Sequence, residues 1–258
     1  MLVSVRPRCA LTLALAALLC AASVGPALAD QPVSLREALT GKRARDGRAD
    51  VHAPSVARYR SESGNQFVLD RSGDVALLRY ERSDEVWALR PTPAPGGDII
   101  YRNDIGQPVI RATRLGGLIL FTPDRPAGAP AALLGEGAPS KPPKLGPTEL
   151  FAVLARSSAR ASRAAQRTIA FVAPDMHSGA EYVVASASGV AADTLVRMGA
   201  LREGQPYLAR VKTVRFRLGK KMDVRFHDGI VDVTINPSEG IAGRPSSSRI
   251  AKAIVGQR

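Results

Sequence analysis

The sequence predicts an α+β protein, in which an antiparallel β-meander is followed by a unit that combines a helix with an antiparallel sheet. Between residues 51 and 122, short strand-like runs alternate with turn residues at the spacing of roughly 8 to 12 residues that is typical of antiparallel strands. After residue 147, a stretch with helical periodicity precedes further strand-like runs. A hydrophobic content of 45% with 23% charged residues is typical of a folded protein.

Residues 1–29 have the pattern of a secretory signal peptide. Arg6 and Arg8 give it a positive start, an apolar run follows, and Ala27 and Ala29 are small residues of the kind that signal peptidase selects. We therefore expect cleavage after Ala29 and a periplasmic or secreted protein. The apolar run is shorter than the about 20 residues of a transmembrane helix, and no later run approaches that length. We expect no transmembrane segment after cleavage.

Both cysteines of the chain, Cys9 and Cys20, lie in this leader. Two alternatives to cleavage are an uncleaved membrane anchor and lipid attachment at Cys20, which the bulky Leu18 and Leu19 disfavour. The mature chain contains no cysteine, so we expect it to fold without disulfides in an oxidising compartment. It has no thiolate for nucleophilic catalysis or metal binding, which excludes envelope enzymes with a catalytic cysteine, such as L,D-transpeptidases.

The antiparallel β region is predicted over residues 51–122, after a polar lead-in segment over residues 30–50. Its strands are separated by turn sequences such as Pro95-Gly96-Gly97. The single tryptophan, Trp87, lies in one of the strands, where a role in the core is favoured over a platform for sugar stacking.

Residues 123–147 contain seven prolines and four glycines. Because proline has no amide hydrogen for a helix or an inner strand, this segment is predicted to be a linker or a long extended surface loop. It is the best candidate for a boundary between two units, although the same segment could also wrap around a single two-layer domain.

Residues 148–258 are predicted to form an α+β region. A helix with four regularly spaced arginines runs to about Gln166, and Tyr182 to Ala185 resembles a strand before a short helix. The region closes with a predicted three-strand antiparallel meander, whose strands are Leu208 to Leu218, Met222 to Phe226 and Ile230 to Ile235.

Four stretches of the chain resemble a family of exported alphaproteobacterial proteins, domain of unknown function 4908. They are FVLDRSGDVALLRYE, EVWALRPTPAP, GDIIYRNDIGQPVIRATRLGGLILFTP and NPSEGIAGRPSS. The resemblance covers most of the mature chain and implies a location in the envelope of a Gram-negative bacterium. It implies no catalytic residues.

Positive charge is concentrated in the second half of the chain. Residues 148–258 carry 17 Lys and Arg against nine Asp and Glu, whereas residues 30–147 carry 17 against 14. A basic face can attract an anionic envelope component, such as lipopolysaccharide, anionic lipid or an anionic polymer, or an envelope protein. The candidate binding residues are the arginines of the helix and of the first meander strand, namely Arg156, Arg160, Arg163, Arg167, Arg215 and Arg217. The alternative to a binding role is that these arginines only keep the surface of the protein soluble.

Nucleic acid is not an expected partner, because aromatic residues are not interleaved with the basic ones. No cofactor motif occurs, and His52, His177 and His227 lack the spacing of a metal site. We therefore expect a non-enzymatic binding or interaction protein. One alternative is an envelope hydrolase that uses His177 or His227 with a carboxylate or a serine. The other is a structural subunit of an envelope assembly.

Overall fold

The computed structural model of the protein describes residues 53–139, 143–176 and 179–256. The predicted signal peptide (residues 1–29) and lead-in segment (residues 30–50) lie outside the described residues, as do His52 and His177. The described residues form two hydrophobic cores, one built from the first eight strands and one from the helices and strands that follow. No helix of the described ranges is both long enough and apolar enough to cross a membrane.

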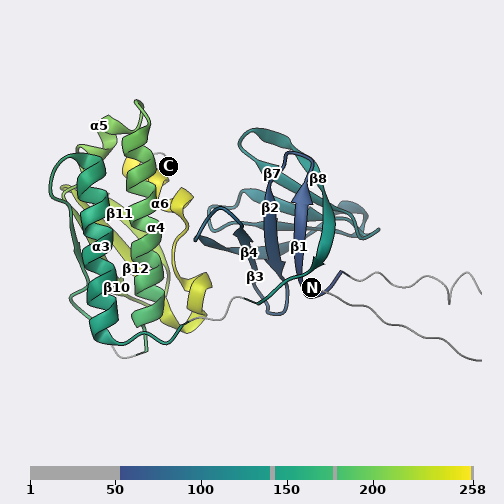
Figure 1. Ribbon diagram of the computed structural model, residues 1–258, viewed down its shortest axis with the longest axis horizontal. Helices are drawn as coiled ribbons and strands as arrows, with labels where there is room; N and C mark the ends of the chain where they lie inside the picture. Colours follow the sequence, from purple (N-terminus) through teal and green to yellow (C-terminus); the bar gives the residue numbers. More distant parts are fainter. Residues whose placement is uncertain (1–52, 140–142, 177–178, 257–258) are drawn as a thin grey trace, which may run out of the picture. The chain divides into compact units, whose positions relative to one another are not determined.

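The first eight strands form a closed antiparallel barrel, in which each strand pairs with the next and the last pairs with the first. Their bounds are Val56–Ser61 (β1), Gln66–Asp70 (β2), Ala76–Tyr80 (β3), Val86–Ala94 (β4), Asp98–Arg102 (β5), Pro108–Ala112 (β6), Leu118–Thr122 (β7) and Arg125–Glu136 (β8). This arrangement confirms the predicted meander and shows that it closes on itself (Figure 1).

The barrel interior is filled by the alternating apolar residues of its strands. In β1, Ala57 and Tyr59 are buried while Arg58 is exposed, and the Tyr59 ring stacks on the Phe67 ring of β2 at 5.5 Å between centroids. Trp87 of β4 is only partly buried: it packs against this core and also lines a cleft, so the predicted core role holds for part of its surface. The alternation explains why the opposite face of each strand is free to carry charge.

The linker predicted over residues 123–147 is wrong for its first half, because β8 occupies Arg125–Glu136 and completes the barrel. A strand tolerates proline where the missing amide has no ladder partner. Pro126 and Pro130 both lie in the half of β8 that is aligned with β7 alone, whereas the proline-free half from Ala131 onward is aligned with β1. Only the residues after Glu136 connect the barrel to the next helix.

The second core lies between helices and a four-stranded sheet (Figure 1). The elements are Pro147–Ala165 (α3), Ala170–Val172 (β9), Glu181–Ala200 (α4), Gln205–Leu208 (α5), Thr213–Leu218 (β10), Asp223–His227 (β11), Ile230–Ile235 (β12), the 3-10 segment Pro237–Gly243 (η2) and Ser247–Val255 (α6). The predicted basic helix is confirmed as α3, and the protein has the predicted α+β class.

The predicted antiparallel meander at the end of the chain is wrong in its connectivity. The strand order is β11-β12-β10-β9, and β10 runs parallel to both β12 and β9, so only β11 and β12 form a hairpin. The physical reason lies in β12, whose Val231, Val233 and Ile235 are fully buried. Because its apolar face is the most deeply buried, β12 lies between β10 and β11, and β11 lies at the edge of the sheet instead of between the other two strands as predicted. The first strand is also shorter than predicted, because Leu208 ends α5 and β10 begins at Thr213.

The strand predicted over Tyr182 to Ala185 is also wrong, since these residues form the first turns of α4. Helix α4 is buried on most of its surface, because it packs against α3, α6 and β10. A helix that is apolar almost all round loses the 3.6-residue periodicity that would identify it, and a short apolar run then resembles a strand.

Helices α3 and α4 cover one face of the sheet, which leaves the other face open (Figure 1). We call this open face the outer face. On β10, β11 and β12 it consists of every second residue, namely Thr213, Arg215, Arg217, Asp223, Arg225, His227, Ile230, Asp232 and Thr234. Six of these nine residues are charged or imidazole side chains, so the outer face is polar where the opposite face is apolar.

Candidate functional site: a basic cleft

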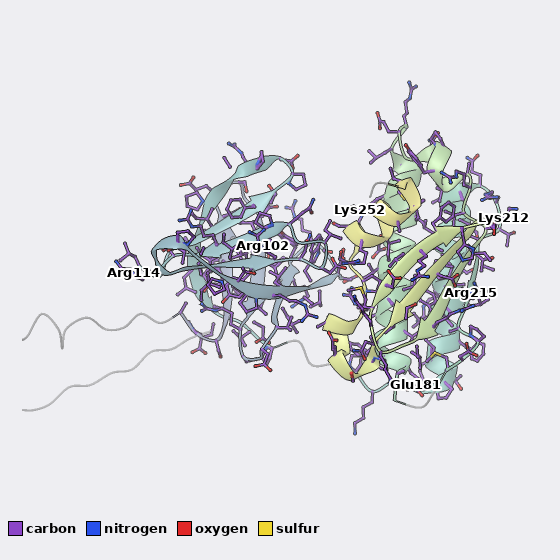
Figure 2. The ribbon with its side chains drawn as sticks, turned by 180° about the vertical axis from the view of Figure 1, so that it is seen from behind. Arg102, Arg114, Glu181, Lys212, Arg215 and Lys252 are labelled. Carbon is purple, nitrogen blue, oxygen red and sulfur yellow. The ribbon has the colours of Figure 1, made fainter. Side chains whose placement is uncertain are left out.

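Asp232 lies at the centre of the outer face, and basic side chains surround it. The strand register aligns it with Arg215 of β10 on one side and with Arg225 of β11 on the other. Arg215 donates two hydrogen bonds to the carboxylate, the one from Nη2 being 2.7 Å long, and His227 Nε2 lies 2.7 Å from Oδ2. Seen from the side opposite α3 and α4, Arg215 lies on this sheet face (Figure 2). The carboxylate thus fixes the direction of a guanidinium group and of an imidazole.

The electrostatics of this cluster favour the ionised carboxylate. The hydrogen bonds from Arg215, with a smaller effect of the bond to His227, lower the pKa of Asp232 to about 2, although burial acts in the opposite direction. The same hydrogen bond raises the pKa of Arg215. Arg217 adds a longer contact of 3.7 Å to Asp232. The single carboxylate of Asp232 therefore faces two arginines, Arg215 and Arg217, and the cluster keeps a net positive charge.

The outer face forms one wall of a cleft of about 1260 Å³. The opposite wall comes from β4 and from the turn after β5 in the barrel, and η2 with the start of α6 supplies further lining. Eight cationic side chains line this cleft against four carboxylates, Asp104, Asp223, Asp232 and Glu239. The eight are Arg90, Arg102, Arg215, Arg217, Lys221, Arg225, Arg244 and Arg249. The cleft is thus a concave surface with an excess of positive charge.

Two arginines of the barrel wall stand directly opposite each other. The register of β4 and β5 aligns Arg90 with Arg102, and both side chains point away from the barrel core because their neighbours Leu89 and Tyr101 are buried inside it. Like charges directly opposite in a sheet are destabilising. Arg90 forms an ion pair with Glu239 at 2.9 Å, whereas the one described partner of Arg102 is the Gly106 carbonyl, to which it donates at 2.9 Å.

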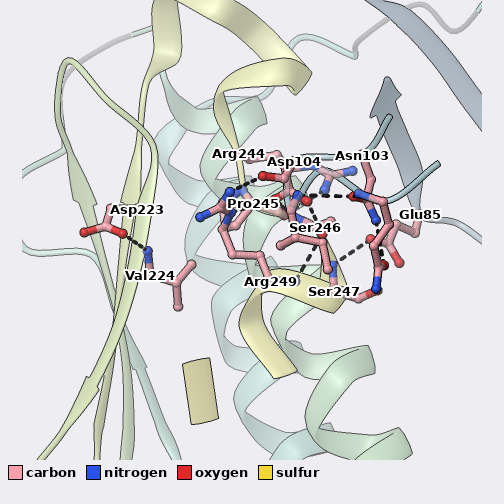
Figure 3. A network of polar contacts seen from close by, with 12 residues as sticks. Glu85, Asn103, Asp104, Asp223, Val224, Arg244, Pro245, Ser246, Ser247 and Arg249 are labelled. Carbon is pink, nitrogen blue, oxygen red and sulfur yellow. Dashed lines mark hydrogen bonds and ion pairs between the residues drawn. The ribbon is translucent and has the colours of Figure 1, made fainter. Parts of the chain in front are cut away.

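A polar network joins the barrel to the start of α6 (Figure 3). Asp104 accepts hydrogen bonds from the Ser246 amide at 2.9 Å and from Arg249 Nε at 3.1 Å, and Glu85 accepts one from the Ser247 amide at 2.9 Å. The carboxylates of the barrel therefore satisfy amides of the first turn of α6, where negative charge is favoured.

Arg244 is the most buried cation of the cleft lining, with 4% of its surface exposed. It donates from Nη2 to the Val86 carbonyl at 2.6 Å, and its Nε has no hydrogen-bond partner among the described residues. Burial lowers the pKa of the Arg244 guanidinium, and the neighbouring Glu85 opposes that shift. We assign Arg244 to the support of the cleft rather than to contact with a ligand.

Residues 34–254 match the family described as Domain of unknown function (DUF4908), which is most of the chain. The chain belongs to the DUF4908 family. No curated protein and no solved structure shows significant similarity to it. The match confirms the predicted resemblance to DUF4908, whereas export and an alphaproteobacterial origin stay predictions.

The DUF4908 fold separates the six candidate arginines into two groups. Arg215 and Arg217 lie on the outer face and line the cleft. The four others belong to α3 or follow it, on the helix layer that covers the opposite face of the sheet. Of these, Arg160 pairs with Asp193, and Arg167 donates to the Val211 carbonyl while its buried Nε has no partner in the described part of the chain.

Arg156 and Arg163 are exposed on α3 and make no ion pair with a described residue. Substitution of either residue changes the charge of the protein without changing the cleft. Among the histidines of this DUF4908 protein, His227 alone lies within the described residues, and it lines the cleft. The described ranges contain no group of three or more His, Cys, Asp or Glu residues that could hold a metal ion.

Six of the eight cations that line the cleft among the described residues were not predicted from the sequence, namely Arg90, Arg102, Lys221, Arg225, Arg244 and Arg249. A signal for the first pair was present, because Arg90 and Arg102 lie six residues before and after Gly96 of the recognised Pro95-Gly96-Gly97 turn. Residues at equal distances from a hairpin centre face each other. The position of Lys221 in the cleft depends on the displacement of β11, which no local pattern reveals.

The Asp232 cluster leads to a prediction about acid stability. The Asp232→Asn variant should lose about 1 to 3 kcal/mol of unfolding free energy at neutral pH, because Arg215 loses a charged acceptor. Since folding depresses the pKa of Asp232, its contribution is present above the unfolded pKa of 3.8 and is lost as the pH falls towards about 2. The difference between wild type and variant should therefore shrink between about pH 4 and 2.

Urea unfolding as a function of pH checks this expectation. The matched control is Asp228→Asn, whose side chain is 95% exposed at the neighbouring turn. A constant difference between wild type and Asp232→Asn across the whole pH range would contradict the assigned ion pair.

Proposed function

We propose that this DUF4908 protein is an exported envelope protein that binds an anionic ligand in the basic cleft, without catalysing a reaction. The observation that carries the proposal is the set of eight cations against four carboxylates around one cavity of about 1260 Å³. Concave sites lined by charge of one sign raise the local concentration of ligands of the opposite sign. The charge of the second half of the sequence supports the same class of partner, such as lipopolysaccharide, anionic lipid or an anionic polymer.

The geometry also supports recognition beyond general attraction. Arg215 is held by a two-point contact with Asp232, and Arg225 by a contact of 2.8 Å between its Nε and Asp223. A guanidinium whose direction is fixed loses less entropy when it binds an anion, because its side chain is already ordered. Arg217 and Lys221 supply positive charge beside these fixed groups, in the same cleft.

Binding to vesicles tests the proposal. The protein should bind vesicles that contain phosphatidylglycerol and lipopolysaccharide, and bind neutral phosphatidylcholine vesicles far more weakly. Each basic residue near an anionic surface contributes about 1 kcal/mol, so reversal of two charges should reduce the affinity by at least about tenfold. The test variant is Arg217→Glu with Lys221→Glu, and binding is measured by co-sedimentation at several salt concentrations.

The control for this experiment is Arg156→Glu with Arg163→Glu on α3, which changes the net charge equally. Its affinity should stay close to that of wild type if the cleft is the site. An equal loss in both variants would assign the binding to net charge alone, and a loss confined to the α3 variant would move the site to the helix. Binding that does not weaken with added salt would contradict the electrostatic basis of the proposal.

The export of the protein is part of the proposal and rests on the sequence of residues 1–29. Fractionation of the native host, followed by amino-terminal sequencing, should find the mature protein in the periplasmic fraction or the medium, starting at Asp30. A chain that retains its first residues in the cytosol would overturn the proposed location.

A hydrolase is the second candidate, and it is favoured by the 2.7 Å contact between His227 Nε2 and Asp232 Oδ2 inside the cleft. General base catalysis needs a histidine that reaches a nucleophile. Within the described ranges, no hydroxyl group that could act as a nucleophile forms a hydrogen bond with His227. The Asp232 carboxylate also accepts hydrogen bonds from Arg215, so it does not serve His227 alone. Binding is therefore the better supported function.

A further inference from the structure

The positive charge of the cleft is divided between two walls. On the barrel wall, Arg90 and Arg102 stand opposite each other in the register of β4 and β5. Glu239 pairs with Arg90 alone, so the charge of Arg102 is offset by no carboxylate of the described residues. The repulsion between Arg90 and Arg102 destabilises the protein without a ligand. Such a local cost is expected at a binding site, where the ligand supplies the missing negative charge.

On the sheet wall, the excess charge lies on Arg217 and Lys221. Arg215 and Arg225 have their own carboxylates, whereas Arg217 reaches Asp232 only at 3.7 Å. Lys221 is exposed and forms no ion pair within the part of the chain that the structure describes. Each wall therefore offers a cationic group that is ready to receive an anion.

The size and the charge of the cleft indicate a ligand with more than one anionic group. Its volume of about 1260 Å³ is larger than the roughly 300 to 1,000 Å³ typical of sites for single small molecules. With the buried Arg244 left out, the cationic side chains of the cleft exceed the carboxylates by three, and one phosphate monoester carries a charge of about −1.5 to −2. Two phosphate groups therefore match the excess, whereas three carboxylate groups of single charge would be needed.

We propose that the ligand carries at least two phosphate groups, an inference that rests on the proposed function of anion binding. Arg102 on the barrel wall would hold one phosphate, and Arg217 and Lys221 on the sheet wall would hold the other. Arginine is suited to this role, because its planar fork can donate two hydrogen bonds to one phosphate. Once one phosphate is bound, the second one binds as an intramolecular step with a high effective concentration. The affinity therefore depends on whether the ligand spans both walls.

A length series of soluble phosphates tests this inference by calorimetry on the chain that begins at Asp30. The probes are orthophosphate, tripolyphosphate and longer linear polyphosphates. Bivalent binding can exceed monovalent binding by about 10² or more, but only for ligands long enough to reach both sites. We expect a step of about 10²-fold in affinity at the length that spans the cleft.

Two single variants probe the two walls, namely Arg102→Glu for the barrel and Lys221→Glu for the sheet. Each should abolish the step and reduce the affinity for long polyphosphate at least about tenfold, with a far smaller effect on orthophosphate. Arg163→Glu on α3 is the control and should leave the step unchanged. Circular dichroism and the melting temperature of each variant show whether it is folded.

The outcomes separate this inference from the proposed function. An affinity that rises smoothly with length, or a step that survives either reversal, overturns the two-wall arrangement while leaving anion binding intact. Absence of binding to every phosphate probe and to anionic vesicles overturns both. A parallel measurement with lipopolysaccharide vesicles, before and after enzymatic removal of the phosphates of the lipid, distinguishes a lipid headgroup from a soluble polyphosphate as the source of the two groups.

Discussion

The Phe216→Ala variant should lose about 3 to 5 kcal/mol of unfolding free energy, because it removes a large aromatic side chain from a closed core. Phe216 is 1% exposed, lies on the central strand β10 and contacts the Phe171 ring at 5.9 Å between centroids. The strands that flank β10, namely β9 and β12, contribute closely packed side chains to the same core. These side chains can only partly fill the cavity that the loss of the Phe216 ring would leave.

Urea unfolding of the purified protein measures this loss. Phe151→Ala is the matched control, because the same substitution is made at a side chain that is 74% exposed on α3. The control should change the unfolding free energy by less than about 0.5 kcal/mol. Equal effects at the two positions would contradict the placement of the second core between the helices and the sheet.

The Asp104→Ala variant should be the most destabilising change in the barrel loops, with a loss of about 3 kcal/mol. The carboxylate is 12% exposed and accepts hydrogen bonds from the amide and the hydroxyl of Ser246 and from Arg249. Removal of the carboxylate leaves the Ser246 amide without a partner and takes one acceptor from the partly buried Arg249, which keeps its hydrogen bond to the Asp104 main-chain carbonyl. An unpaired buried group costs about 1 to 3 kcal/mol.

Thermal unfolding followed by circular dichroism checks the Asp104 prediction, with Asp124→Ala as the control at an exposed turn between β7 and β8. Asp104→Asn should recover part of the loss, because its single amide oxygen can still accept the hydrogen bond from the Ser246 amide. A melting temperature of Asp104→Ala equal to that of the control would show that the contacts with α6 do not stabilise the protein.

The sequence permitted a good prediction of local structure where turns and alternation agree. The strands from residue 56 to 122 and helix α3 are of this kind, because Gly-rich turns and the two hydrophobic periods are local properties. The closing strand β8 was missed because its prolines are compatible with a strand only in the context of its neighbours. The place of β12 between β10 and β11 is likewise a result of tertiary packing, which rewards burial of Val231, Val233 and Ile235.

The basic character of the cleft could be predicted from the sequence, but the residues that line the cleft could not. The excess of arginine pointed to an anionic partner, and two of the six candidates, Arg215 and Arg217, line the cleft. The regular spacing of Arg156, Arg160 and Arg163 describes a helix surface and carries no information on which face of the sheet that helix covers. A charge pattern in a sequence can therefore suggest a class of ligand, but it does not show which residues line a cleft.

The closure of the barrel has a consequence for how such a chain can change. The Gly137 amide donates to the Val56 carbonyl at 2.9 Å, so the polypeptide enters and leaves the eight strands at adjacent points. A module whose two ends meet can be inserted, removed or exchanged without breaking the pairing inside it. Residues 56–137 therefore meet the geometric condition for insertion into a host loop with a short spacer at each junction, but such a graft would lose the contacts of Glu85 and Asp104 with the start of α6.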